Sequence, residues 1–141
     1  MRIKVKKLNQ EARIPTYAHE GDAGMDLYSC DNYVLNPGER VLVSTGLAFE
    51  IPNGYELQIR PRSGLAWKNG ISIVNSPGTL DAGYRGELKV ILINHGKEVF
   101  NIRKGDKIAQ AVLNKIERAE IEEVDELSET ERGANGFGST G

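Results

Sequence analysis

The chain has 141 residues, of which 39% are hydrophobic and 27% charged, as is typical of one globular, soluble domain rather than of a disordered chain. Its 18 basic and 20 acidic residues leave a net charge of −2. The composition therefore predicts no bulk attraction to nucleic acid or to an anionic membrane.

The first residues, Met1–Lys7, alternate between apolar and basic side chains and lack the apolar core of a signal peptide. They are expected to form a strand. The longest unbroken aliphatic run, Val90–Ile93, is far too short to cross a membrane. A cytoplasmic location is the resulting expectation.

The single cysteine, Cys30, excludes an intrachain disulfide and argues against a cysteine-ligated zinc site. Together with His19 or His95 it could form a nucleophilic pair. The simpler prediction is that Cys30 is a small apolar residue of the core.

Apolar and polar residues alternate in many short runs, for example at Val41–Val43 and Tyr55–Arg60. Turn signals such as Asn36-Pro37-Gly38 and Pro52-Asn53-Gly54 separate these runs. The pattern predicts an all-β sandwich, jelly roll or barrel. The only helical stretch expected in the first hundred residues is a turn or two after Ser63.

The segment Ser76–Glu87 lies between two apolar runs, Ile71–Val74 and Leu88–Ile93, and is predicted to connect them as a hairpin. It has more glycines than a tight turn needs, which indicates a close approach of backbone to another group. One hypothesis is that Asp81 and Tyr84 face a bound small molecule. The alternative is a plain hairpin tip in which Asp81 closes an Asx turn.

Two strands, Leu88–Ile93 and Ile108–Leu113, are apolar on nearly both faces, although Gln110 interrupts the second. A strand of this kind needs a second covering surface. A partner subunit could supply that surface, so a homo-oligomer is predicted. The alternative is a strand at the centre of a two-sheet sandwich.

The run Glu117–Glu131 carries eight carboxylates and one arginine, and is expected to be a solvated linker or strand edge. The last ten residues, Arg132–Gly141, contain four glycines and cannot form a stable isolated element. Because they also hold an arginine, Phe137 and two hydroxyls, we expect an arm that becomes ordered on a ligand bound mainly by a neighbouring subunit.

Five segments now stand out together: Ala23–Ser29, Pro61–Ala66, Gly78–Glu87, Gly105–Gln110 and Arg132–Gly138. In order and spacing they resemble the five signature segments of the trimeric dUTPase family, the deoxyuridine triphosphate nucleotidohydrolases. The resemblance spans most of the chain. One segment alone would be weak evidence, whereas five ending in Gly-Phe-Gly are highly specific.

The resemblance implies a distorted β jelly roll of the β-clip type, a single domain over residues 1–131 with at most one short helix. Residues 132–141 would be a flexible arm that closes over an active site. The chain would assemble as a homotrimer whose three sites are shared between subunits. With Mg²⁺, it would hydrolyse dUTP to dUMP and pyrophosphate. This reaction keeps uracil out of DNA and supplies dUMP for dTMP synthesis.

The resemblance also implies roles for the phosphate-binding residues. Arg62, Ser63 and Gly64 would hold the α- and β-phosphates, with Ser63 as a plausible N-cap of a short helix; a purely structural cap is the alternative. Gln110 is polar within an apolar strand and needs a hydrogen bond, and the family assigns the matching glutamine a phosphate contact. Asp26 would act on Mg²⁺ through water.

Asp81 matches the catalytic aspartate of the family, which activates the water that attacks the α-phosphorus. Tyr84 would lie against the deoxyribose and leave no room for a 2′-hydroxyl. Substrate contacts would also come from residues on the hairpin, on the following strand and in the arm: Asn75, Gly78, Leu80, Lys89, Arg132, Phe137, Gly138 and Ser139. Phe137 would stack on the uracil as the arm closes.

One departure from the family pattern is Gly83, which stands where many members have a second acidic residue. The nearest rival is a dCTP deaminase-like enzyme of the same fold. That chemistry would need a glutamate near Ala82 and a Ser-Ser pair in the phosphate segment, and neither is present. A second rival is a non-enzymatic jelly-roll module, which has no reason to keep Asp81, Tyr84 and the arm together.

Overall fold

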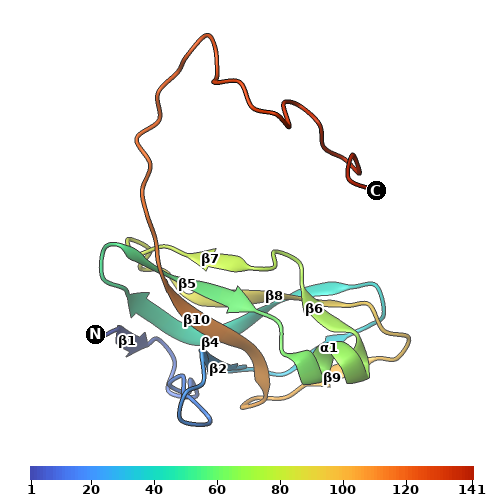
Figure 1. The fold of residues 1–141 in the computed structure, drawn as a ribbon. Coiled ribbons are helices and arrows are strands. Elements are labelled where there is room, and N and C mark those ends of the chain that lie inside the picture. Colours follow the sequence, from blue (N-terminus) through green and yellow to red (C-terminus); the bar gives the residue numbers. More distant parts are fainter.

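The computed structural model describes all residues, 1–141, as ten strands and one short helix (Figure 1). The elements are β1 (Lys4–Lys7), β2 (Gly24–Tyr28), β3 (Tyr33–Leu35), β4 (Arg40–Glu50), β5 (Tyr55–Arg60), α1 (Ser63–Asn69), β6 (Ile71–Ile73), β7 (Gly78–Leu80), β8 (Leu88–Asn94), β9 (Phe100–Ile102) and β10 (Lys107–Lys115). The all-β prediction with at most one short helix is confirmed. No helix is long and apolar enough to span a membrane.

Two four-stranded sheets and one two-stranded ribbon make up the body. Their strand orders are β1-β4-β8-β6, β2-β10-β5-β7 and β3-β9, and all pairs are antiparallel. The chain moves repeatedly from one sheet to the other, as in the distorted jelly roll that the sequence predicts. This interleaving brings residues that are far apart in the sequence to the same edge of the molecule.

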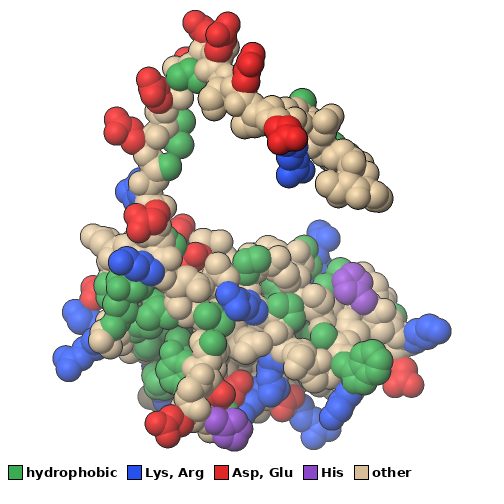
Figure 2. All heavy atoms as spheres, viewed as in Figure 1, with side chains coloured by type: hydrophobic (Ala, Val, Ile, Leu, Met, Phe, Trp, Pro, Cys, Tyr) green, Lys and Arg blue, Asp and Glu red, His purple; other side chains and the backbone are tan.

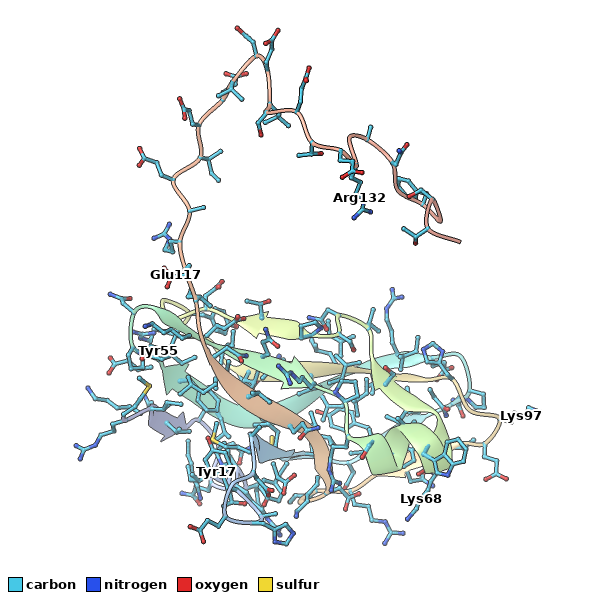
Figure 3. All side chains as sticks on the ribbon, viewed as in Figure 1. Tyr17, Tyr55, Lys68, Lys97, Glu117 and Arg132 are labelled. Atoms are coloured by element: carbon cyan, nitrogen blue, oxygen red, sulfur yellow. The ribbon has the colours of Figure 1, made fainter.

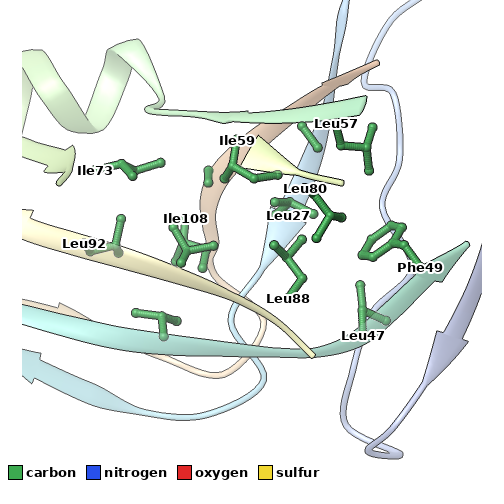
Figure 4. Packing of buried hydrophobic residues seen from close by; sticks show 14 of the residues in the cluster. Leu27, Leu47, Phe49, Leu57, Ile59, Ile73, Leu80, Leu88, Leu92 and Ile108 are labelled. Carbon is green, nitrogen blue, oxygen red and sulfur yellow. The ribbon is translucent and has the colours of Figure 1, made fainter. Parts of the chain in front are cut away.

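The core lies between the two four-stranded sheets (Figure 4), and on strands such as β5 and β8 buried residues alternate with more exposed ones. On β5 the inward side chains include Leu57 and Ile59, and on β8 they include Val90 and Leu92; all four are buried. Period-2 patterning in the sequence is therefore the direct cause of the sandwich. Every buried side-chain polar atom has a hydrogen-bond partner.

Strand β4 contains a bulge where its pairing with β8 shifts between Ser44 and Leu47. Gly46 has φ +68°, and a Cβ at this position would lie 2.9 Å from the Cβ of Ala12. Glycine is therefore required at the bulge. Cys30 packs nearby, is buried, and donates to the Ser44 hydroxyl at 3.3 Å, which confirms it as a core residue.

The predicted hairpin around Ser76–Glu87 is confirmed only in its outer part. Strands β6 and β8 pair as expected, with Ile73 opposite Leu92. The connection is not a simple turn, however, because Gly78–Leu80 forms β7 and pairs with β5 in the other sheet. The segment therefore bridges both sheets before it reaches Asp81.

The outer face of the β1-β4-β8-β6 sheet carries several apolar side chains that are incompletely covered. Ile91 and Ile93 on β8 are only half-buried, and Leu42 on β4 and Val74 after β6 remain about half exposed. The outer face of β8 is therefore not closed within one chain. The predicted homo-oligomer stays a prediction.

After β10 the chain leaves the sheets and curves over the body as an extended segment (Figures 1 and 3). The backbone hydrogen bond from Ile116 to Gly54, at 2.9 Å, is the last that joins this segment to the body. Residues Glu117–Glu131 are exposed and form no strand, so the run is a linker and not a strand edge. Its acidic side chains line the rising segment in Figure 2.

Candidate active site

A first cavity, of about 290 Å³, lies where β2 and β10 meet the start of α1. We call it the Arg62 pocket. It is lined by Ala18, Asp22, Ala23, Gly24, Asp26, Arg62, Ser63, Gly64 and Gln110. The pocket thus collects the predicted phosphate-binding residues from three segments of the sequence.

Asp26 lies close to two cationic side chains at the Arg62 pocket. Its side chain is 13% exposed, with one carboxylate oxygen 3.8 Å from Nε of Arg62 and the other 3.0 Å from Nζ of Lys107. Two predicted site residues from different segments, Asp26 and Arg62, therefore lie close together. Lys107 is a charged partner to which the sequence reasoning gave no role.

Gln110 lies opposite Asp26 in the β2–β10 ladder. Its side-chain amide donates to the backbone carbonyl of Pro61 at 3.0 Å, so the predicted need for a hydrogen bond is met. A Cβ at Gly24 would lie 2.5 Å from the Gln110 side-chain oxygen. The absence of a side chain at Gly24 therefore leaves room for the Gln110 side chain to pack against the backbone of β2.

The prediction that Ser63 is an N-cap is wrong. The cap position is Arg62, with φ −91° and ψ 128°, and the helix begins at Ser63 without a side-chain cap. The cause is visible in the first helical bond, in which the Ala66 amide donates to the Arg62 carbonyl at 3.0 Å. The Ser63 hydroxyl is consequently free to face the Arg62 pocket, and its role no longer includes capping.

A second cavity, of about 490 Å³, lies beside the loop that follows β7. We call it the Asp81 pocket. Its walls are formed by Leu42, Thr79, Leu80, Asp81, Tyr84, Glu87, Leu88 and Lys89. A narrower cleft of about 50 Å³ continues past Lys89 to Asn75 and Gly78, so the predicted base-reading residues border connected surfaces.

Asp81 is exposed, and its carboxylate makes no hydrogen bond or ion pair within the chain. The Asx-turn alternative is not supported, because the turn is closed by its backbone: the Tyr84 amide donates to the Asp81 carbonyl at 3.2 Å. The two aspartates thus differ in kind. Asp26 is paired with cations, whereas Asp81 is available to act on a bound molecule.

Two residues of the Asp81 pocket region were missed by the sequence reasoning. The Glu87 carboxylate accepts hydrogen bonds from the Ser44 hydroxyl and from the Gly46 amide, the latter at 3.0 Å. The Arg85 guanidinium donates to the carbonyl of Ala82 at 2.6 Å. A weak signal for both was their position inside a signature segment, but the partners of Glu87 lie more than 40 residues away and could not be foreseen.

Within one chain the predicted site is incomplete. The Arg62 pocket and the Asp81 pocket share no lining residue. In the arm, Arg132 donates only to the carbonyl of Asn135, at 2.9 Å, and Phe137 is fully exposed. No hydrogen bond joins the arm residues Arg132, Phe137, Gly138 or Ser139 to either pocket.

Comparison with known proteins gives a consistent result. The dUTPase family model matches residues 10–141. The deoxyuridine 5′-triphosphate nucleotidohydrolase of Nautilia profundicola is 62% identical over 141 residues, which cover 100% of this chain and 99% of that protein. The enzyme of the same name from Clostridium tetani is 55% identical over 139 residues, with coverages of 99% and 96%.

Solved structures agree with these relatives. The Staphylococcus bacteriophage 80alpha dUTPase with dUPNHPP aligns with a TM-score of 0.92 at 33% identity, over 99% of this chain and 98% of that chain. A mutant dUTPase from phage phi11 of S. aureus, described with a structural Mg(II) ion, aligns with a TM-score of 0.84 at 30% identity, over 89% and 98%. The chain therefore belongs to the dUTPase family.

Proposed function

We propose that this dUTPase hydrolyses dUTP to dUMP and pyrophosphate through a water molecule that Asp81 activates for attack on the α-phosphorus. The observation that carries the proposal is the unpaired Asp81 carboxylate beside a cavity that Tyr84 also lines. Family membership gives the substrate. The contrast with the ion-paired Asp26 supports the division of roles.

The complete site is assembled from several copies of the chain in a homotrimer. Two observations support this assembly: the Asp81 and Arg62 pockets share no lining residue, and no hydrogen bond joins the arm to either of them. The incompletely covered apolar face around Leu42 and Ile91 offers a surface for subunit contact. One subunit then supplies the base and sugar sites, a second the phosphate site and a third the arm.

The uracil lies in the cleft between Asn75 and Gly78, where backbone groups of Gly78, Leu80 and Tyr84 read its polar edge. A wrong base would leave these buried groups unpaired, which is a strong source of selectivity. A Cβ at Gly78 would come within 3.3 Å of the Asn75 amide nitrogen, so glycine keeps this cleft open. Lys89 lines both the cleft and the Asp81 pocket and adds a cation at their junction.

The triphosphate is held by Arg62, Ser63, Gly64 and Gln110. The chain has no group of three or more metal-ligating side chains, and the Asp26 carboxylate is already shared by two cations. Such a donor set fits Mg²⁺ only as an ion that takes its oxygens from phosphates and water. When bound in this way, with Asp26 acting through water, Mg²⁺ would offset the charge of the triphosphate.

In the reaction, the Asp81 carboxylate accepts a proton from the attacking water. The water oxygen forms a bond to the α-phosphorus as the bond to the β-phosphate oxygen breaks, and pyrophosphate leaves. Arg62 and the arm's Arg132 stabilise the negative charge of the triphosphate. Phe137 stacks on the uracil while Gly138 and Ser139 reach the phosphates, and closure of the arm excludes bulk water.

The test is pyrophosphate release from dUTP, dCTP, dTTP and UTP, assayed in parallel with an ammonia assay on dCTP. The proposal predicts rapid pyrophosphate release from dUTP alone. Ammonia from dCTP with inert dUTP would instead support the deaminase. Tight binding of dUTP without any turnover would support a non-enzymatic module.

A further inference from the structure

The aromatic ring of Tyr84 rests on two residues to which the proposed mechanism gives no role, Gly86 and Glu87. The Tyr84 hydroxyl donates to the backbone carbonyl of Glu87 at 3.1 Å. A Cβ at Gly86 would lie 2.6 Å from Cζ of Tyr84 and 3.0 Å from its Cε2, closer than real Cβ contacts allow. The ring therefore lies directly over Gly86, and only a residue without a side chain leaves room for it.

Glu87 in turn is fixed to the bulge of β4. Its carboxylate accepts hydrogen bonds from the Ser44 hydroxyl and, at 3.0 Å, from the Gly46 amide, and its other oxygen lies 3.5 Å from Nζ of Lys89. The side chain is only 24% exposed. Because Gly46 is itself confined by its neighbours, the bulge is a rigid anchor for the backbone carbonyl that holds the tyrosine hydroxyl.

We propose that Gly86 and Glu87 are positioning residues that set the Tyr84 ring against the deoxyribose and thereby determine the preference for dUTP over UTP. This inference rests on the proposed function and on the role that the family resemblance implies for Tyr84, whose ring would lie against the deoxyribose. A ring displaced from the sugar loses its contact with the deoxyribose and leaves room for a 2′-hydroxyl, so discrimination between dUTP and UTP falls.

The first test compares Gly86→Ala with Gly83→Ala, a matched substitution in the same loop. A Cβ at Gly83 meets nothing within 4 Å, and neither glycine has a left-handed φ. Gly86→Ala should lower the ratio of kcat/KM for dUTP to that for UTP by about tenfold or more, mainly through KM for dUTP. Gly83→Ala should leave the ratio unchanged; equal effects of the two substitutions would overturn the proposal.

The second test compares Glu87→Ala with Glu87→Gln. Alanine removes the acceptor for Ser44 and Gly46, so the ratio should fall and the Gly46 amide should exchange faster with solvent deuterium. Glutamine keeps an acceptor oxygen and should restore most of the ratio. If glutamine is as harmful as alanine, the charge near Lys89 matters rather than the anchor, and the proposal is wrong. Glu98→Ala, an exposed glutamate without a side-chain partner, is the control.

A third measurement does not depend on activity. The NMR signals of the Tyr84 ring, assigned by comparison with Tyr84→Phe, should shift in Gly86→Ala and Glu87→Ala but not in Gly83→Ala. Unmoved signals in the first two variants would refute the positioning role. A wild-type protein without dUTP hydrolysis would instead refute the proposed function, and the ring signals would still decide whether Gly86 and Glu87 position Tyr84.

Discussion

Two aspartates of the same chemical type are given different roles by their surroundings. Asp26 lies between Arg62 and Lys107 and is largely buried. Asp81 is exposed and unpaired. A carboxylate engaged by two cations is not free to approach a bound water, whereas an unpaired one beside a cavity is suited to act as general base.

Replacing Asp81 by Asn tests this division of roles. The amide cannot accept the proton of the attacking water, so kcat should fall by about 10²–10⁴-fold. Affinity for a non-hydrolysable dUTP analogue, measured by calorimetry, should remain close to that of the wild type. Asp125→Asn, an exposed carboxylate of the linker, is the control. Weak binding combined with normal turnover would contradict the base role.

At the scale of residues, the sequence predicted several side chains that line the two pockets but missed Glu87, which fixes one of their walls. Asp26, Asp81 and Gln110 were predicted because each lies in a recognisable segment. The role of Glu87 depends on the bulge at Ser44–Gly46, which lies 41 to 43 residues away. Local pattern cannot reveal such a contact, because it exists only once both sheets have formed.

The loop Asp81–Glu87 is also tied to the edge of the sheet through Arg85. Its guanidinium donates to the carbonyl of Ala82 at 2.6 Å and lies 3.7 Å from the Glu50 carboxylate, which is 2.8 Å from Nζ of Lys4. The hydrogen bond and charge of Lys4, and then the charge of Arg85, hold the pKa of Glu50 below its ordinary value of 4.5.

The stabilisation from Glu50 should therefore depend on pH. A carboxyl group with a lowered pKa in the folded state stabilises the protein above its ordinary pKa, and this contribution is lost as the pH falls through the lowered value. Urea midpoints of the wild type and Glu50→Gln should differ slightly at pH 7 and converge well below pH 4.5. A difference that persists unchanged under acid conditions would show that the ion pairs are not its source.

The arm is the element that the geometry separates most clearly from the body. Deleting residues 132–141 should cripple dUTP hydrolysis, because stacking by Phe137 and the charge of Arg132 are lost, while the melting temperature changes little. The physical reason is that none of these residues packs in the core. Deleting 137–141 alone is an informative intermediate, because it removes Phe137 and keeps Arg132. A large fall in melting temperature would show that the arm is part of the folded body.

At the scale of elements, long strands were predicted from the sequence, whereas the short strand β7 was not. Long alternating runs such as Tyr55–Arg60 correspond to observed strands because one buried face is a strong signal. The three residues of β7 were predicted as part of a turn, since Gly78 and the preceding proline mask so short a strand. The linker after Lys115 was predicted correctly because eight carboxylates cannot be buried together.

For the whole molecule, the central claim is that no single chain contains a complete site. The apolar patterns of Leu88–Ile93 and Ile108–Leu113 predicted a homo-oligomer, and the resemblance to the family implied sites shared between its subunits. The two pockets, which share no lining residue, and an arm without hydrogen bonds to either pocket support our proposal that the missing parts of each site come from other copies of the same chain. If each site is shared between subunits, two variants that are each inactive alone should restore activity when they are combined in one trimer.

Two inactive variants, Asp81→Asn and the deletion of residues 132–141, should complement each other in mixed trimers. The two variants are co-expressed with different tags, and mixed trimers are isolated by purification on each tag in turn. Each mixed trimer then has one site that combines an intact Asp81 with an arm from another subunit. The account predicts about a third of the wild-type turnover per trimer, and none when the arm-deleted partner also carries Asp81→Asn. Mixed trimers as inactive as their parents, or a protein that is monomeric in solution, would contradict the shared site.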